Sequence, residues 1–464
     1  TAHHKALLAL SLLVPCTLHP APLAAQSPTS LTLYNDGQVL VRRTLPLEIP
    51  KGNSTQRLAL GPIDPALVFP LDPGVAFGTG AFDAGVDFES VLRRSLGRKL
   101  TFVSGRDTTV AELVGVDPER YRLPNGMITF DRPGTIRFPA EMVALEPTYI
   151  VGMKSDNALK NLRVGYFAQG GGWQAAYQVI LAGGKDGPAR VLGQAIVNGG
   201  TLRFNDVELQ LLAGQVNRVA EQDMAGGIRA RREVLAAAAP MPYQPASEQK
   251  VGEFHLYTLP GRSSLEPGTI TTASLFEPAT ARTTKTFDVR GQIPYWGGLP
   301  QYLDEQEVPV TVTYTVLRPK GSDLGDRPLP AGVARLYQPD SAGRLQLIGE
   351  AATDHSPAGE DLRLPAGTAF DLTAKRIQKS YSTRRDSLPG NTWRTIATAD
   401  YSVTVTNAGD EAATVEVLEE RGGEWSVVTS SVKPEKRSAT RTVFKLPVPA
   451  RGKATLTYRV RVVW

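Results

Sequence analysis

Cysteine and histidine are nearly absent from this sequence of 464 residues. It has one cysteine, Cys16, and five histidines, of which only His255 and His355 lie beyond residue 25. A chain that loses Cys16 forms no disulfide and has no thiolate nucleophile. Two imidazoles are too few for a zinc site built on several histidines and cysteines, whereas a carboxylate site for a hard cation is not excluded. The sequence predicts no cofactor.

The sequence also lacks a strong excess of one charge. The net charge is +5, and the basic residues are scattered, so we predict no nucleic-acid partner. Two basic clusters are interpreted as solvated faces, with anionic envelope polymers or lipid headgroups as the alternative. They consist of Arg93, Arg94, Arg98 and Lys99, and of Lys375, Arg376, Lys379, Arg384 and Arg385.

Long apolar runs are missing as well, apart from a short one near the start. Lys5 precedes the apolar segment Ala6 to Val14, and prolines interrupt the chain before the small pair Ala24 and Ala25. This pattern is typical of a secretory signal peptide, and we predict cleavage after Ala25 and a periplasmic or extracellular location. The run falls short of the roughly 20 apolar residues of a membrane-spanning helix, so we predict no transmembrane helix in the mature chain. Lipidation of Cys16 is a disfavoured alternative, because Pro15 occupies the position of a small residue.

What the sequence has in abundance is alternation with period two, together with 44 glycines and 35 prolines for turns. Leu31 and Leu33, a turn at Asp36-Gly37, and then Val39 and Val41 predict a β-hairpin. The segment from Phe88 to Leu96 is the one stretch with helical spacing. We therefore predict an all-β fold with minor α content, built from several domains of antiparallel sheets.

The predicted domains follow breaks in this pattern. A signal peptide at residues 1–25 precedes a small β domain at 26–145 and a central antiparallel domain at 146–290. The central domain contains a segment rich in glycine, alanine and proline at 222–251, which we interpret as a mobile loop. Residues 291–464 form a C-terminal β domain that ends in an immunoglobulin-like sandwich, because short strands alternate with turns about every ten residues. The terminal alternation up to Trp464 also resembles the closing strand of an outer-membrane β-barrel, which leaves a barrel-associated protein as an alternative.

Several longer motifs occur in one order. They are GGWQAAYQV at 171–179, VNGGTLRFNDVELQLLAG at 197–214, LPAGVARLYQPDSAGRLQLIGE at 329–350, DHSPAGEDLRLPAGTAFDLTAKR at 354–376 and YSVTVTNAGDEAATVEVLEE at 401–420. Together they resemble a bacterial family of unknown function related to the mucoidy-inhibitor A proteins, over roughly residues 146–464. Phe204 replaces a tryptophan of the family, and the long coiled coil of some relatives is missing. The resemblance implies an extracytoplasmic β-rich protein and carries over no catalytic residue.

The candidate sites are few. Asp304, Glu305 and Glu307 form the closest acidic cluster, which could hold a cation or supply paired carboxylates, or could be a solvated loop. Trp173 and Tyr177 lie four apart, hence on one face of a strand, where they either pack in the core or form a binding surface. The run Asp354-His355-Ser356 has the letters of a catalytic triad, but adjacent residues cannot adopt its geometry, so we predict a polar turn.

These observations favour a secreted or periplasmic cell-envelope protein of unknown biochemical activity that acts as a binding or structural module. An envelope component or a protein is the expected partner. A carboxylate-based or cation-dependent hydrolase is the alternative, with Asp304, Glu305 and Glu307 as its first candidates. A binding protein would show an exposed groove or sheet edge, whereas a hydrolase would gather these acids in a deep pocket.

Overall fold

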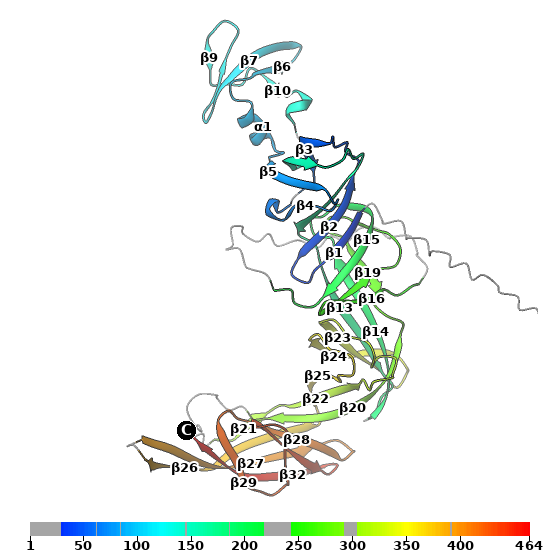
Figure 1. The fold of residues 1–464 in the computed structure, drawn as a ribbon. Helices are drawn as coiled ribbons and strands as arrows, with labels where there is room; N and C mark the ends of the chain where they lie inside the picture. The colour runs from blue at the N-terminus through cyan, green and yellow to red at the C-terminus, as the bar shows by residue number, and fades with distance from the viewer. Residues whose placement is uncertain are drawn as a thin grey trace, which may run out of the picture.

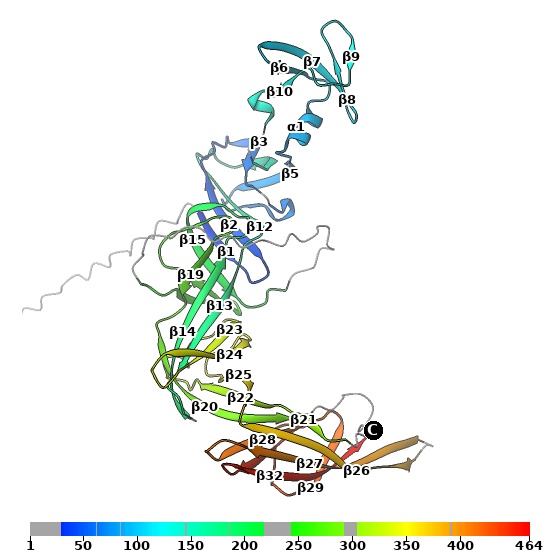
Figure 2. The same cartoon turned by 180° about the vertical axis from the view of Figure 1, so that it is seen from behind.

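The computed structural model describes residues 29–61, 63–83, 85–143, 146–184, 186–217, 243–291, 304–389 and 392–464. The predicted signal peptide and residues 222–242 of the predicted loop lie outside these ranges. The chain forms an elongated succession of β-sheets, with strands β6–β10 at one end and the sandwich containing β26–β32 at the other (Figures 1 and 2). The prediction of an all-β fold of several antiparallel sheets is confirmed.

The first sheet joins the beginning of the chain to its middle. Its order is β16 (Ser247–Val251), β17 (Phe254–Thr258), β15 (Phe204–Ala213), β1 (Thr29–Leu33), β2 (Gln38–Leu45), β12 (Leu162–Gln169) and β4 (Phe69–Pro70), with β18 (Ser263–Leu265) beside β15. The predicted hairpin is confirmed as β1 and β2, which pair with Leu31 opposite Val41. The predicted mobile loop extends too far, because its last residues, 247–251, form strand β16, which pairs with β17.

The predicted boundary at residue 145 does not separate two domains. β1 runs parallel to β15, and β2 pairs with β12, so strands from both sides of this boundary share one sheet. A small second sheet also crosses it, with β11 (Thr148–Ser155) between β3 (Gly52–Ala59) and β5 (Val75–Asp83). Local alternation fixes where a strand lies but not its partner, which explains the error. A 3-10 turn, η1 (Pro65–Leu67), precedes β4.

Residues 85–143 form a separate small unit. The only α-helix in the described part of the chain, α1 (Phe88–Arg94), begins at Asp87, whose Oδ1 accepts a hydrogen bond from the Ser90 amide at 2.9 Å. A five-stranded sheet follows, with β10 (Thr135–Arg137), β6 (Lys99–Ser104), β7 (Asp107–Val116), β8 (Glu119–Arg122) and β9 (Ile128–Thr129) in this order, and then η2 (Ala140–Met142). Its own core contains Leu100, Phe102 and Tyr121.

The largest sheet has eleven strands and connects the middle of the molecule to its C-terminal end. Its order is β24 (Leu345–Thr353), β23 (Gly332–Pro339), β13 (Gly172–Leu181), β14 (Asp186–Asn198), β20 (Ala279–Arg290), β28 (Ala413–Glu420), β31 (Arg441–Val448) and β30 (Pro434–Lys436), with β19 (Ile270–Ser274) beside β14 and with β22 (Val310–Leu317) joining β20 to β25 (Leu362–Thr368). The predicted boundary at residue 290 is therefore also wrong. β23 pairs with β13, and β28 pairs with β20, so this sheet contains residues from both predicted domains.

A second five-stranded sheet covers one end of the large sheet. It contains β21 (Gln306–Val308), β26 (Leu372–Leu388), β27 (Thr392–Asn407), β32 (Gly452–Val463) and β29 (Glu424–Ser430). Val403 of β27, Val415 of β28 and Phe444 of β31 belong to one buried cluster, so the two sheets form a sandwich. The predicted C-terminal sandwich is present, and its kinship to immunoglobulin-like domains stays a prediction.

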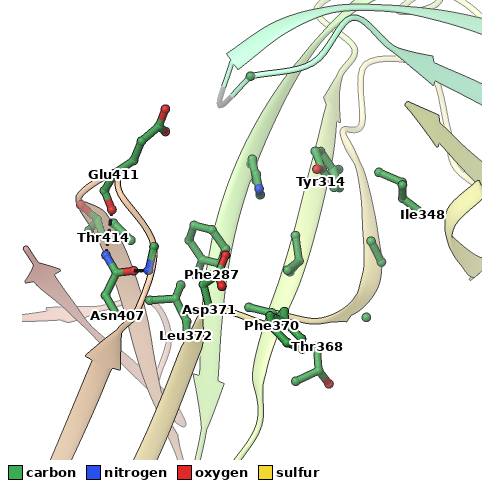
Figure 3. A pocket seen from close by; sticks show the side chains of 18 of the residues that line it. Phe287, Tyr314, Ile348, Thr368, Phe370, Asp371, Leu372, Asn407, Glu411 and Thr414 are labelled. Carbon is green, nitrogen blue, oxygen red and sulfur yellow. Dashed lines mark hydrogen bonds between the residues drawn. The ribbon is translucent and has the colours of Figure 1, made fainter. Parts of the chain in front are cut away.

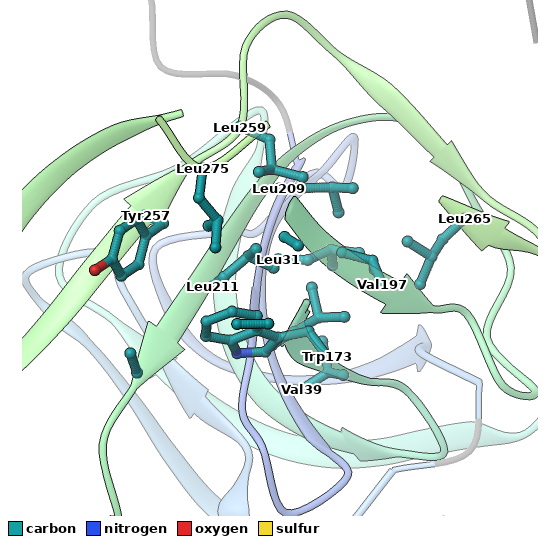
Figure 4. Packing of buried hydrophobic residues seen from close by; sticks show 14 of the residues in the cluster. Leu31, Val39, Trp173, Val197, Leu209, Leu211, Tyr257, Leu259, Leu265 and Leu275 are labelled. Atoms are coloured by element: carbon teal, nitrogen blue, oxygen red, sulfur yellow. The ribbon is translucent and has the colours of Figure 1, made fainter. Parts of the chain in front are cut away.

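The fold thus has two large hydrophobic cores. The first, which we call the upper core, is built from side chains of the first sheet and of the eleven-stranded sheet. It includes Leu31, Trp173, Val197 and Leu209 (Figure 4). The second, which we call the sandwich core, lies between the sheets of the C-terminal sandwich. Strands β20 and β22 extend from one core to the other.

Candidate functional site: a cleft between two cores

A cleft lies where β20 and β22 pass between the two cores. Ala281 of β20 and Val316 of β22 pack in the upper core, while Val289 and Val310 pack in the sandwich core. Because side chains two apart on a strand share a face, the alternate residues between these positions, Lys285 and Phe287 of β20 and Val312 and Tyr314 of β22, point to the same side. They line a cavity of about 530 Å³, which we call the intercore cleft (Figure 3). This volume is in the range of ordinary ligand pockets.

The floor of the intercore cleft combines aromatic rings with one cation. Lys285 of β20 lies opposite Tyr314 of β22, and Phe287 lies opposite Val312. The Lys285 ammonium is 5.0 Å from the centre of the Phe287 ring and 6.0 Å from that of Tyr314. Such contacts hold a cation over a ring face. Lys285 forms no ion pair with another described residue. Burial raises the pKa of Tyr314, so its hydroxyl stays a hydrogen-bond donor.

Two loops form the opposite wall. The first, residues 368–372, joins β25 to β26 and exposes 95% of Phe370 to solvent. The second, residues 408–412, joins β27 to β28 and is held by the buried Asn407. The Asn407 amide donates to the Glu411 carbonyl at 2.8 Å, and its Oδ1 accepts from the Gly409 amide at 2.9 Å. The Ala408 amide donates to the Asp371 carbonyl at 2.8 Å and so joins the two loops.

Carboxylates lie on these loops, across the cleft from Lys285. Asp410 is paired with Arg451 at 2.5 Å. Asp371 and Glu411 are exposed and form no side-chain ion pair with the described residues. The cleft therefore offers ring faces, a cation and two acceptor carboxylates to one ligand. This combination suits a polar molecule with flat apolar surfaces and many hydroxyl or amine groups.

The predicted acidic cluster lies elsewhere. Glu305 is exposed, and its Oε1 is 2.7 Å from the Lys375 ammonium, while Glu307 lies opposite Lys375 in the pairing of β21 with β26. Asp304 is exposed and precedes β21. None of the three lines the intercore cleft. Within the described ranges, the structure has no group of three or more His, Cys, Asp or Glu side chains that could hold a metal.

Of the two alternatives for Trp173 and Tyr177, the structure shows core packing and not a binding surface, since both side chains are buried in the upper core on one face of β13. The Trp173 indole donates to the Leu212 carbonyl at 3.2 Å, and the Tyr177 hydroxyl donates to the Pro330 carbonyl at 2.7 Å. Their polar atoms are thus satisfied inside the protein, as core packing requires. His355 accepts a hydrogen bond from the Ala331 amide at 3.2 Å through Nδ1, which fits the predicted polar turn.

None of the site residues predicted from sequence belongs to the intercore cleft. The one local indication of the cleft was a lysine, Lys285, on the same strand face as the apolar Phe287 and Val289. The pairing of Lys285 with Tyr314, however, is a matter of register, which local alternation does not determine. Comparisons with protein-family models, with curated proteins and with solved structures find no match to this chain.

Proposed function

We propose that this chain is a secreted or periplasmic cell-envelope protein whose task is binding, and that the intercore cleft holds its ligand. The observation that carries the proposal is the position of Lys285 over two aromatic rings, opposite the carboxylates of Asp371 and Glu411. None of these three charged groups forms an ion pair with another residue that the structure describes. The segment with signal-peptide character and the resemblance to the mucoidy-inhibitor A relatives support the extracytoplasmic location.

The ligand that we propose is a segment of an envelope saccharide. Sugar rings have apolar faces that stack on aromatic side chains, and their hydroxyls donate to carboxylates. Phe370 provides an exposed ring at the mouth, and Phe287 and Tyr314 provide rings at the floor. In the described part of the chain, no helix has the length and apolar character needed to cross a bilayer.

The hydrolase alternative draws no support from the acids that motivated it. Glu305 is neutralised by Lys375, and Asp304, Glu305 and Glu307 lie on an exposed segment rather than in a deep pocket. A nucleophile or a general acid needs a substrate held within hydrogen-bond reach, which an exposed strand end does not provide.

The proposal is tested with soluble peptidoglycan fragments, which contain both sugar and peptide, in titration calorimetry with residues 26–464. We expect saturable binding that Lys285→Ala and Phe370→Ala each weaken about three- to tenfold, the usual effect of losing a ring or cation contact. Phe130→Ala is the matched control, because Phe130 is another exposed phenylalanine, 66% accessible, outside the cleft.

Binding that none of the cleft variants alters, or no binding at millimolar fragment, would refute the cleft as the site. The location is tested separately by fractionating cells that express the full chain. Protein in the extracytoplasmic fraction whose mass corresponds to a start at Gln26 is expected, and an unprocessed cytoplasmic protein would contradict that part of the proposal.

A further inference from the structure

A second pocket lies on the opposite face of the same two strands. Asp288 and Arg290 alternate with Phe287 and Val289 along β20, so they point away from the sandwich core. Together with Thr313 of β22, Arg363 of β25, Leu418 of β28 and Arg441 of β31, they line a cavity of about 500 Å³. We call it the arginine pocket. It shares no lining residue with the intercore cleft.

A buried carboxylate with an unused oxygen lies in the arginine pocket. The Asp288 side chain is 2% exposed. Its Oδ2 accepts hydrogen bonds from the Thr313 hydroxyl at 2.7 Å and from the Arg363 guanidinium at 3.3 Å. Its Oδ1 is buried and has no hydrogen-bond partner among the residues that the structure describes. An unpartnered buried carboxylate oxygen is costly, and a hydroxyl or amine donor of a bound molecule would satisfy it.

The cations around Asp288 outnumber the anions. Arg441 pairs with Glu420 at 3.0 Å, but its buried Nε has no partner in the described ranges, and Arg290 forms no ion pair with another described residue. Three guanidinium groups and the two carboxylates of Asp288 and Glu420 leave one net positive charge. Guanidinium groups hold carboxylate and phosphate oxygens with particular strength because their donors match the geometry of these anions.

We infer that the arginine pocket binds a small hydroxylated anion, a sugar acid or a sugar phosphate. Its charged oxygens accept hydrogen bonds from Arg290 and Arg441, and one of its hydroxyls donates to Asp288 Oδ1. A simple anion such as sulfate satisfies the arginines but has no donor for Asp288. A neutral sugar has the donor but leaves the net positive charge without a counterion. The site thus selects a molecule that has both groups.

Titration calorimetry of the chain from residue 26 with D-galacturonate and with glucose 6-phosphate tests this inference and distinguishes the two sources of the anion. D-glucose and sulfate are the comparison ligands. We expect at least one hydroxylated anion to bind more tightly than both comparison ligands. Arg290→Gln should weaken this binding about tenfold, as the loss of a charge-assisted hydrogen bond does.

Arg282→Gln is the matched control, because Arg282 is exposed on the same face of β20, outside the pocket, and its loss changes the net charge equally. Asp288→Asn tests the hydroxyl contact, since it keeps the shape of the side chain, replaces the acceptor oxygen that faces the ligand by an NH2 group and removes the negative charge. This variant should bind sulfate more tightly and lose its preference for the hydroxylated anion. Phe370→Ala should have no effect, which separates this site from the intercore cleft.

Three outcomes overturn the inference. The first is that none of the anions binds at millimolar concentration. The second is that sulfate binds as tightly as the hydroxylated anions, which identifies a general anion site. The third is that Arg290→Gln and Arg282→Gln have equal effects, because binding then follows the overall charge and not the pocket.

Discussion

Glu419 is fully buried between two arginines inside the C-terminal sandwich. Its Oε1 is 2.7 Å from Arg376 and its Oε2 is 3.2 Å from Arg421, and the Tyr458 hydroxyl donates to Oε1 as well. Burial is the largest influence on the pKa of Arg376 and lowers it, but Glu419, Tyr458 and Tyr401 together outweigh burial, so the net pKa is raised. Burial and then Glu419 raise the pKa of Tyr458. The charges of Glu419, Arg376 and Arg421 therefore stabilise one another inside the sandwich.

This cluster corrects one part of the sequence analysis. Arg376 belongs to a basic run that we interpreted as a solvated face, and the structure buries it while its neighbour Lys375 stays exposed. Adjacent residues of a strand point to opposite faces, so a basic run cannot be exposed on both sides of a covered sheet. The partner of Arg376, Glu419, lies 43 residues away in sequence, and nothing in the local pattern indicated it.

Glu419→Gln is expected to destabilise the protein by about 3–5 kcal/mol, because it leaves two buried arginines without their counterion. The measurement is urea-induced unfolding of residues 26–464. Glu420→Gln is the control, since the neighbouring Glu420 is exposed and its pair with Arg441 is worth about 0–1 kcal/mol. If both variants unfold at the same urea concentration, the buried cluster does not stabilise the sandwich.

Within single strands, the alternation of apolar and polar residues predicts most of the secondary structure but not all of it. The strand predicted for Trp173 and Tyr177 is confirmed as β13, and in β13, β14 and β27 the alternate apolar residues point into a core. The alternation pattern does not predict β16, because its residues SEQKV are all exposed and do not alternate between apolar and polar. Backbone pairing with β17 makes this segment a strand, and such pairing leaves no trace in side-chain polarity.

Strand β13 allows a direct test of which face is buried. Trp173 is 5% exposed and packs in the upper core, whereas the adjacent Gln174 points to solvent. Trp173→Ala is expected to cost about 3–5 kcal/mol, the usual effect of removing a large buried aromatic side chain. Gln174→Ala should change stability by less than about 0.5 kcal/mol, as surface substitutions do.

Thermal and urea unfolding of the two β13 variants measures this difference. Similar losses in both would show that the indole is not part of the core, and would restore Trp173 as a candidate for a binding surface. Tyr177 offers an independent check, because Tyr177→Phe removes only the hydrogen bond to the Pro330 carbonyl and should cost about 1 kcal/mol.

For the whole molecule, the order of strands within the sheets is what the sequence did not reveal. β1 lies parallel to β15 although Leu31 and Leu209 are far apart in sequence, and the eleven-stranded sheet crosses the predicted boundary at residue 290. Both candidate pockets depend on these pairings, because they occupy the two faces of β20 and β22. Long-range register places Lys285 and Asp288 in their sites, and local patterns cannot predict it.

The same topology defines residues 85–143 as an insertion. Asp83 at the end of β5 and Thr148 at the start of β11 are directly paired in antiparallel strands, so the chain leaves and re-enters the fold at neighbouring points, about 5 Å apart. The insertion packs around its own small core of Leu100, Phe102 and Tyr121. It lies at one end of the molecule, far from the sandwich (Figures 1 and 2).

Replacing residues 85–145 by a short Gly-Ser linker is therefore expected to leave the rest of the protein folded, because loop closure between paired strand ends costs little. The strand signal in circular dichroism should persist, as should the binding of whichever of the two hydroxylated anions the whole chain binds. Deleting the hairpin β1–β2 is the contrasting change, since Leu31 and Val41 are fully buried in the upper core, and that deletion should abolish soluble expression. Aggregation of the first variant would instead mean that the insertion stabilises the neighbouring sheets and is not an independent unit.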